Sequence, residues 1–167
     1  KLTKIYKSMY YMQISERNVK YMKVKECMCE NVCCVRPETK LNEIAKTMEK
    51  NQIGCVPVCD NSNCIVGLIT DRDIILRGIA SDKDVKTTTA SDIMSCNVCT
   101  CNKDDEVYNV EKKMAENQVR RIPVVENNKV VGILTLGDLA KYNKETNGEH
   151  FCNTFEDICE CTGKNDQ

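Results

Sequence analysis

The sequence predicts an α/β fold of the α+β type in which one structural unit occurs twice. The first observation behind this prediction is the stretch at 66–73, Val-Gly-Leu-Ile-Thr-Asp-Arg-Asp, which returns at 131–138 as Val-Gly-Ile-Leu-Thr-Leu-Gly-Asp. Each copy joins a short apolar run, typical of a buried strand, to a Thr and an Asp that suit a helix start. The second observation is that the repeat extends well beyond this corner.

The longer repeat consists of identical residues at a constant distance. The distance is 66 positions up to the turn at 60–64, and it falls to 65 at Gly67 and Gly132 because that turn is one residue longer than the turn at 126–129. Turns tolerate such insertions, so both copies are expected to share one fold. The residues that recur 66 positions later are Met28, Asn31, Val32, Cys33, Met48, Asn51, Gln52, Pro57 and Val58.

Hydrophobic spacing predicts the elements of the first copy. Leu41, Ile44 and Met48 recur at helical spacing after Thr39, a suitable N-cap, and Gly78 is the predicted stop of the closing helix. The predicted elements are a helical entry at 24–28, a strand at 32–35, a helix after 39, strands at 53–58 and 65–70, and a helix at 71–78.

The second copy repeats this order after a polar linker at 81–91. Its helix presents Val107, Val110 and Met114 on one face. The predicted elements are strands at 98–101, 119–125 and 130–135, the helix around 107–114, and a last helix at 138–144.

The two Thr/Asp corners are candidate binding sites. A hydroxyl, a carboxylate and free backbone N–H groups at a helix N-terminus can hold a phosphorylated sugar. The alternative is purely structural, because Thr70 and Thr135 can cap the helices while Asp73 and Asp138 complement the helix dipole.

With both corners and the preceding Asn-Gln and Pro-Val segments, the chain resembles a tandem pair of CBS domains, a Bateman module. The resemblance covers residues 22–143 and is greatest to small stand-alone bacterial proteins. It implies two CBS repeats, each a small sheet with two packed helices, related by a pseudo-two-fold axis and assembling as disc-shaped homodimers. The implied division is an N-terminal extension at 1–21, repeats at 22–80 and 92–144, the linker at 81–91 and a tail at 145–167.

The resemblance also implies that each cleft takes its Thr and Asp from one repeat and residues before the Pro strand from the other. Arg120 and Arg121 are then expected with Thr70 and Asp73, and they could grip a phosphate. Alternatively, these arginines point into solvent or pair with Asp71 or Asp73. For the Thr135 and Asp138 corner the expected residues are Gly54 and Cys55, which carry no cation. The base would lie among Ile53, Val56, Pro57, Val119, Ile122 and Pro123, with backbone groups around Cys34 and Thr100 at the rim.

Composition narrows the class of protein. The net charge of −1 gives no general case for nucleic acid, and no apolar run is long enough to span a membrane. No signal peptide is expected at the N-terminus. Thirteen cysteines in a chain with a full apolar repeat pattern predict mostly reduced thiols and a cytoplasmic location. The basic, Tyr-rich extension is either an arm for nucleic acid or anionic lipid, or a helix that packs on the module or on a partner subunit.

The acidic tail holds one unusual cluster. A tetrahedral zinc site could be made by His150, Cys152, Cys159 and Cys161, although paired Cys-x-Cys ligands are less usual. Alternatively, the segment is one helical turn that docks Phe155 and Ile158. Cys96 and Cys99 have redox spacing but no thioredoxin pattern around them.

No catalytic constellation emerges, so we do not expect an enzyme or a required cofactor. The predicted function is regulatory binding of an adenine nucleotide (AMP, ADP or ATP), ahead of S-adenosylmethionine, with signalling through a conformational change and a protein partner. The alternatives are a ligand-free structural or stress-response interaction protein and a thiol or metal sensor.

Overall fold

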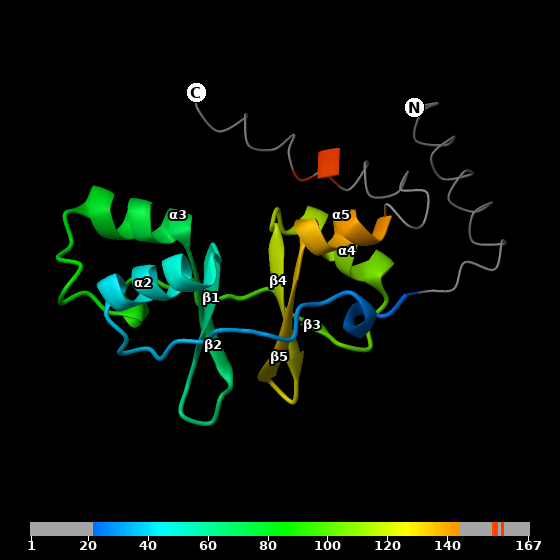
Figure 1. Ribbon diagram of the computed structural model, residues 1–167, viewed down its shortest axis with the longest axis horizontal. Helices are drawn as coiled ribbons and strands as arrows, with labels where there is room; N and C mark the ends of the chain where they lie inside the picture. The colour runs from blue at the N-terminus through cyan, green and yellow to red at the C-terminus, as the bar shows by residue number, and fades with distance from the viewer. Residues whose placement is uncertain (1–21, 144–154, 157, 159–167) are drawn as a thin grey trace, which may run out of the picture.

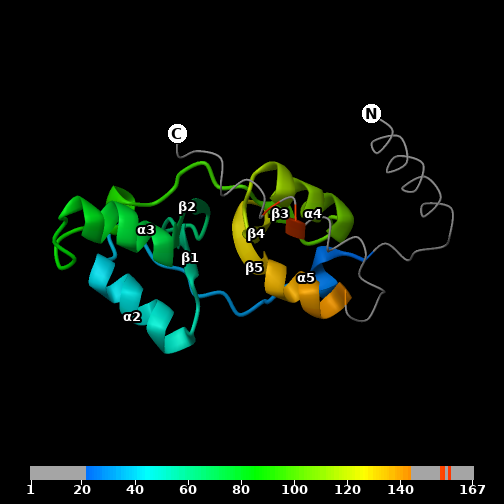
Figure 2. The same ribbon diagram turned by 90° about the horizontal axis from the view of Figure 1, so that it is seen from above.

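The computed structural model describes residues 22–143, 155–156 and 158. The extension at 1–21 and all four candidate zinc ligands of the tail lie outside the described residues. Figure 1 shows two units side by side. Figure 2 shows α2 (Leu41–Asn51) and α3 (Asp71–Asp73) on one unit and α4 (Val107–Glu116) and α5 (Leu136–Asn143) on the other. The predicted α+β fold of two repeated units is confirmed.

The first unit is built on an antiparallel pair, β1 and β2, and Val35 adds a single parallel bridge to Val58. The apolar face of α2 buries Leu41, Ile44 and Met48 as the spacing predicted. In chain order the elements are the 3-10 turn η1 (Val24–Glu26), α2 (Leu41–Asn51), β1 (Cys55–Cys59), β2 (Ile65–Thr70), α3 (Asp71–Asp73), the π-turn η2 (Ile74–Gly78) and the 3-10 turn η3 (Ile79–Ser81).

The second unit has a three-stranded sheet in the order β3-β4-β5, with β3 parallel and β5 antiparallel to β4. Asn127 and Asn128 both have positive φ, 50° and 63°, which suits the two-residue hairpin between β4 and β5. In chain order the elements are η4 (Ala90–Asp92), β3 (Cys101–Asn102), α4 (Val107–Glu116), β4 (Arg121–Glu126), β5 (Lys129–Thr135) and α5 (Leu136–Asn143).

Three details differ from the sequence-based expectations. Lys40, not Thr39, is the N-cap of α2, because the Thr39 hydroxyl accepts a hydrogen bond from the Arg36 N–H instead. The predicted strands at 32–35 and 98–101 are both shortened, to the bridge at Val35 and to β3 at Cys101–Asn102. Gly78 does not stop the closing helix, which continues to Ser81; the backbone at Gly78 packs so closely on α2 that an added β-carbon would lie 2.7 Å from Leu41.

Each hydrophobic core is completed by the segment that leads into the other repeat. Val24, with Met22 and Met28, packs in the core of α4, β4, β5 and α5, while Ala90 and Ile93 pack in the core of α2, β1 and β2. Figure 2 shows the two crossing segments running between the units. Because each core contains residues of the segment that leads into the other repeat, the two units form one structure.

Reciprocal backbone pairing fixes the exchange. Cys29 and Ile133 exchange two N–H···O hydrogen bonds of 2.9 Å, and Leu68 and Ser95 exchange two of 3.0 Å. These two pairs are equivalent positions of the repeat, so the contact is made twice around a pseudo-two-fold axis. The pairing joins β2 and β5, the strands that end at the two Thr/Asp corners, to the exchanged segments.

Candidate functional site

A cavity of about 620 Å³ lies between the two repeats and is lined by residues of both. A cavity of this size is typical of small-molecule sites, which usually lie between roughly 300 and 1,000 Å³. Its walls come from the segment before Val35, the start of β1, the starts of α3 and β4, and the end of β5. The lining residues are Asn31, Val32, Cys33, Gln52, Ile53, Gly54, Cys55, Asp71, Arg120, Arg121, Ile133, Thr135, Leu136, Gly137 and Phe155.

Thr135 lines this cavity and forms a reciprocal cap with Asp138, which is not itself among the lining residues. The Thr135 hydroxyl and backbone N–H donate to Oδ2 of Asp138 at 2.6 and 3.0 Å, and the Asp138 N–H donates to Oγ1 of Thr135 at 3.2 Å. This is the capping arrangement considered as the structural alternative, and it orients both side chains. Within the described part of the chain, Oδ1 of Asp138 accepts no hydrogen bond and remains available to a ligand hydroxyl.

Arg120 and Arg121 lie in a different place from the one expected. They line the cavity of Thr135, Gly54 and Cys55, whereas Thr70 and Asp73 do not line it. The reason is that the Arg121 side chain, at the start of β4, reaches the residue before β1: a β-carbon on Gly54 would lie 2.8 Å from its Nη2. The expectation that this cleft lacks cations is therefore wrong.

Gly54 makes room for two charged side chains at the cavity wall, those of Arg121 and Asp71. A β-carbon on Gly54 would lie 2.8 Å from both Nη2 of Arg121 and Oδ2 of Asp71, so a larger residue could not be accommodated without displacing them. Across the described residues, Arg121 has no carboxylate within the 4.0 Å of an ion pair. The alternative pairing with Asp71 or Asp73 is therefore not formed by Arg121, and the guanidinium can take up an anion.

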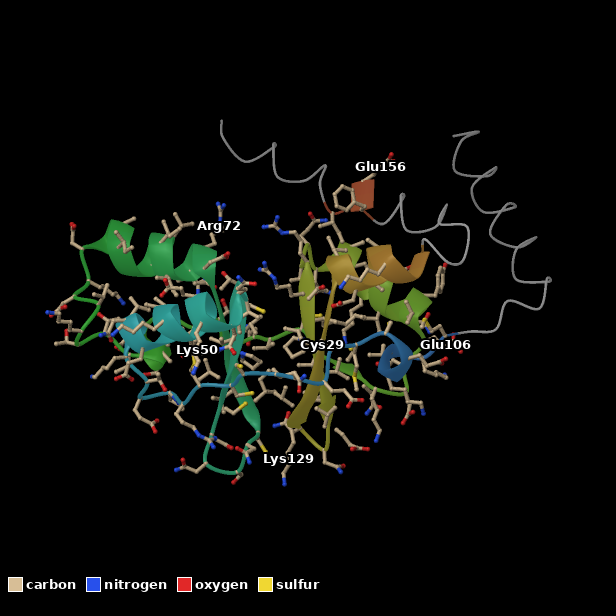
Figure 3. All side chains as sticks on the ribbon, in the orientation of Figure 1. Cys29, Lys50, Arg72, Glu106, Lys129 and Glu156 are labelled. Carbon is tan, nitrogen blue, oxygen red and sulfur yellow. The ribbon has the colours of Figure 1, made fainter. Side chains whose placement is uncertain are left out.

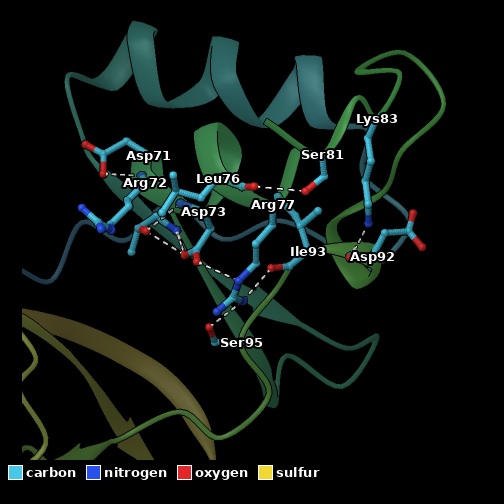
Figure 4. Close-up of polar contacts among 11 residues, drawn as sticks. Asp71, Arg72, Asp73, Leu76, Arg77, Ser81, Lys83, Asp92, Ile93 and Ser95 are labelled. Carbon is cyan, nitrogen blue, oxygen red and sulfur yellow. Dashed lines mark hydrogen bonds and ion pairs between the residues drawn. The ribbon is translucent and has the colours of Figure 1, made fainter. Parts of the chain in front are cut away.

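The Thr70 corner is capped in the same way but differs in its surroundings. The Thr70 hydroxyl donates to Oδ2 of Asp73 at 2.7 Å, and Arg77 lies beside the other carboxylate oxygen at 3.5 Å (Figure 4). Arg77 was not among the predicted site residues. The sequence offered one signal for Arg77: it follows Asp73 by four residues, a spacing at which side chains of a helix can pair. The equivalent residue of the second repeat is Tyr142, which cannot form such an ion pair.

The predicted base slot is only partly present. Ile53 lines the cavity, but Val56 and Ile122 are fully buried in the cores, and Pro57 and Pro123 are buried in the strands beside them. Cys33 lines the cavity in place of Cys34, and the carbonyl of Thr100 accepts a hydrogen bond from Lys113. Sequence reasoning missed Asn31, Val32, Ile133 and Phe155. The first two belong to the repeat, which was a usable signal.

Phe155 reaches the cavity from beyond the second repeat. Phe155, Glu156 and Ile158 are helical, and Ile158 is 3% exposed in the core formed with Leu136 and Leu139. In Figure 3, Glu156 lies above α5. The docked helical turn considered as the alternative to zinc is therefore observed for Ile158, and its neighbour Phe155 provides an aromatic wall.

The cysteines of the described segments are free thiols, and several are buried. Burial raises the pKa of Cys101 and of Cys59 from 9.0 to about 12, with further contributions from Asp105 and from Cys34, respectively. Such thiols stay protonated and unreactive near neutral pH. Over the same segments, no group of three or more His, Cys, Asp or Glu side chains is arranged to hold a metal ion.

Comparison with known proteins explains the repeated corners. The CBS domain family matches this chain twice, at residues 24–80 and 90–145. The chain belongs to the CBS domain family. The CBS domain-containing protein YhcV of Bacillus subtilis is 37% identical over 117 residues, covering 70% of this chain and 82% of that protein. Hypoxic response protein 1 of Mycobacterium tuberculosis is 31% identical over 121 residues, covering 72% of this chain and 85% of that protein.

Solved structures of CBS pairs have the same fold. The CBS domain pair of protein MJ0100, in complex with 5'-methylthioadenosine and S-adenosyl-L-methionine, matches with a TM-score of 0.69 and 30% identity, covering 75% of this chain and 98% of that one. Hypoxic Response Protein I with two coordinated zinc ions matches with a TM-score of 0.68 and 30% identity, covering 72% and 98%. None of the helices in the described segments is long and apolar enough to cross a membrane.

Proposed function

We propose that this chain is a non-catalytic regulatory module that binds an adenine nucleotide in the cavity at the Thr135 corner. The observation that carries the proposal is the composition of that cavity. It combines an apolar wall, Thr135 at a capped helix start, and two arginines that form no ion pair with the described residues. These are the three kinds of surface that a base, a ribose and a phosphate require.

Each part of the nucleotide has a place in this arrangement. The base lies between Val32, Ile53 and Ile133, where aliphatic side chains exclude water. The ribose hydroxyls donate to Oδ1 of Asp138 at the start of α5. The phosphate oxygens accept hydrogen bonds from Arg121 and Arg120, whose forked N–H donors suit an anion. AMP, ADP and ATP are preferred over S-adenosylmethionine because the cavity carries cations.

The comparison with the MJ0100 pair supports an adenosyl ligand, since that related CBS pair was solved with two of them. No group of side chains around the cavity forms a nucleophile with an adjacent base, so binding is expected to act through conformation and not through chemistry. The ligand contacts residues of both repeats, and a ligand that binds one relative arrangement better shifts the population towards it.

We propose that the module forms a homodimer and that the dimer passes the signal on. Ile75, Leu76 and Ile79 are 55%, 48% and 59% exposed on one face of the closing helix of the first repeat. Exposed apolar patches of this kind mark interaction sites. The signal would pass from the dimer to a separate protein partner. A cytoplasmic location fits the free thiols, because reducing compartments keep cysteines unpaired.

A calorimetric titration with AMP, ADP, ATP and S-adenosylmethionine tests the proposal. Binding of one nucleotide should be weakened about 100-fold by the Arg120→Ala/Arg121→Ala pair, whereas adenosine affinity should change little because it lacks the phosphate. Lys112→Ala/Lys46→Ala removes two exposed cations elsewhere and is the matched control. If none of the four ligands binds the folded protein, the proposal fails and a ligand-free interaction protein becomes the better hypothesis.

A metal-binding role is a second candidate, because the related Hypoxic Response Protein I was solved with two zinc ions. The candidate ligands here, His150, Cys152, Cys159 and Cys161, lie outside the described residues. Elemental analysis of the purified protein tests this candidate. One equivalent of zinc that is lost in Cys159→Ser/Cys161→Ser would support it, and a metal-free protein would exclude it.

A further inference from the structure

The two Thr/Asp corners differ in how far their carboxylates are occupied. At the first corner the Thr70 hydroxyl and N–H hold Oδ2 of Asp73 at 2.7 and 2.8 Å. Oδ1 of the same carboxylate faces Nε of Arg77 at 3.5 Å. Both oxygens of Asp73 are therefore engaged. At the second corner only Oδ2 of Asp138 is engaged within the described part of the chain.

Arg77 is itself held by three groups from two different segments. Its Nη1 donates to the Ile93 carbonyl and to the Ser95 hydroxyl, both at 3.0 Å, while Nε faces Asp73 (Figure 4). Ser95 belongs to the segment that enters the second repeat and pairs with Leu68 of β2. The guanidinium thus closes the space between the start of the closing helix and the crossing segment.

The local backbone supports this position of Arg77. Residues Ile74–Gly78 form a π-turn, whereas α5 of the second repeat is assigned as an unbroken α-helix from Leu136 to Asn143. Single π-turns of this kind are frequent at functional sites. The residue equivalent to Arg77 is Tyr142, which carries no positive charge. The sequence therefore supplies the internal cation to one corner only.

We infer that Arg77 selects the ligand site: it occupies the Thr70/Asp73 corner from within, so the chain binds one nucleotide, at Thr135 and Asp138, and not two. This inference rests on the proposed nucleotide binding. A ribose at the first corner would have to displace Arg77 from Asp73 and break its bonds to Ile93 and Ser95. At the second corner, Oδ1 of Asp138 accepts no hydrogen bond from the described residues, so none of them has to be displaced.

Binding stoichiometry tests the inference. Calorimetry with ATP or AMP should give one site per chain for the natural protein and two for Arg77→Ala, in which Asp73 is released. In the Arg77→Ala background, Asp138→Asn should leave only the new site at Thr70 and Asp73. Asp73→Asn should leave only the original site at Thr135 and Asp138. Asn is chosen because its side-chain oxygen can still accept the hydrogen bonds of the cap. Arg72→Ala is the matched control, because Arg72 projects outward from the same helical stretch and makes no ion pair with the described residues (Figure 3).

The outcomes separate this inference from the proposed function. Two sites in the natural protein would overturn the role of Arg77. Where the natural protein binds one nucleotide, a folded Arg77→Ala protein that also binds only one, or none, would overturn it as well. A natural protein that binds nothing would refute the proposed function. If Arg77→Ala then gained a single site that Asp73→Asn removes, the closure of the first corner by Arg77 would still be established.

Discussion

The thioether of Met94 lies directly over Gly67, although the two residues belong to different repeats. Met28 covers Gly132 in the same way at the equivalent position. In each case the methionine stands in the segment leading into one repeat and the glycine in the second strand of the other. Because a β-carbon at either glycine would overlap the methionine side chain, these contacts require glycine for steric reasons and hold the exchanged segments in place.

We expect Gly67→Ala to destabilise the protein by about 1–3 kcal/mol, because overpacking a filled core forces side chains or backbone to shift. The atoms of Met94 nearest to the added β-carbon are Sδ and Cγ, and the Cβ of Met94 lies 3.1 Å from it. Rotation of the Met94 side chain leaves its Cβ in place, so rotation alone does not relieve the overlap. Urea unfolding of the natural protein and the variant measures the difference.

A double-mutant cycle with Met94→Ala is the control for this contact. Met94→Ala alone leaves a cavity, and the added methyl of Gly67→Ala partly fills it, so the double variant should lose less stability than the two single variants together. If the losses of stability were additive, Gly67 and Met94 would not be energetically coupled.

Buried thiols make stability fall in alkaline solution. Burial raises the pKa of Cys101 to about 12, while the thiol in the unfolded chain ionises near its ordinary value of 9.0. Between these values the native state binds more protons than the unfolded state, so its stability is complete below pH 9 and decreases as pH rises towards 12. One such thiol costs about 1.4 kcal/mol per pH unit in this window. Urea unfolding under reducing conditions at pH 8 to 10.5 measures the decline.

The first repeat suggests the variant that isolates this effect. Val35 occupies the position equivalent to Cys101, so Cys101→Val introduces a side chain that the fold already uses there. Stability near pH 7 should be retained and the alkaline decline should become shallower. An unchanged slope would mean that other groups cause the decline.

Phe155 is expected to contribute to ligand affinity without contributing to folding. Its ring lines the cavity but is 47% exposed, so Phe155→Ala should weaken nucleotide binding about fivefold, near the lower end of base–aromatic stacking energies, and leave the melting temperature unchanged. Tyr108→Ala removes an exposed aromatic of α4 that does not line the cavity, and it should leave affinity unaltered. Equal affinities of natural protein and Phe155→Ala would show that the tail is not part of the site.

The sequence predicted the repeated elements well because periodicity and repetition report on burial. Strand β2 was placed residue for residue, and the buried face of α2 followed from Leu41, Ile44 and Met48. Which residues come together at the site was harder to predict from the sequence. Which corner receives Arg121 depends on how β1 and β4 meet across the pseudo-two-fold axis, and the occupation of Asp73 by Arg77 depends on Ser95 of an exchanged segment. Neither relationship is local in the chain.

The closing helix of the first repeat provides the last prediction. Ile75, Leu76 and Ile79 present apolar surface that the described residues do not cover, and the equivalent positions of the second repeat are Ala140, Lys141 and Lys144. If this face joins two copies, Leu76→Glu/Ile79→Glu places four carboxylates in one interface and should convert a dimer to a monomer in sedimentation velocity. The melting temperature at low protein concentration should stay the same, because both side chains are about half exposed in the single chain. Lys50→Glu on α2, exposed on another surface, should remain dimeric. A monomeric natural protein, or a double variant that remains dimeric, would exclude this face as the homodimer interface.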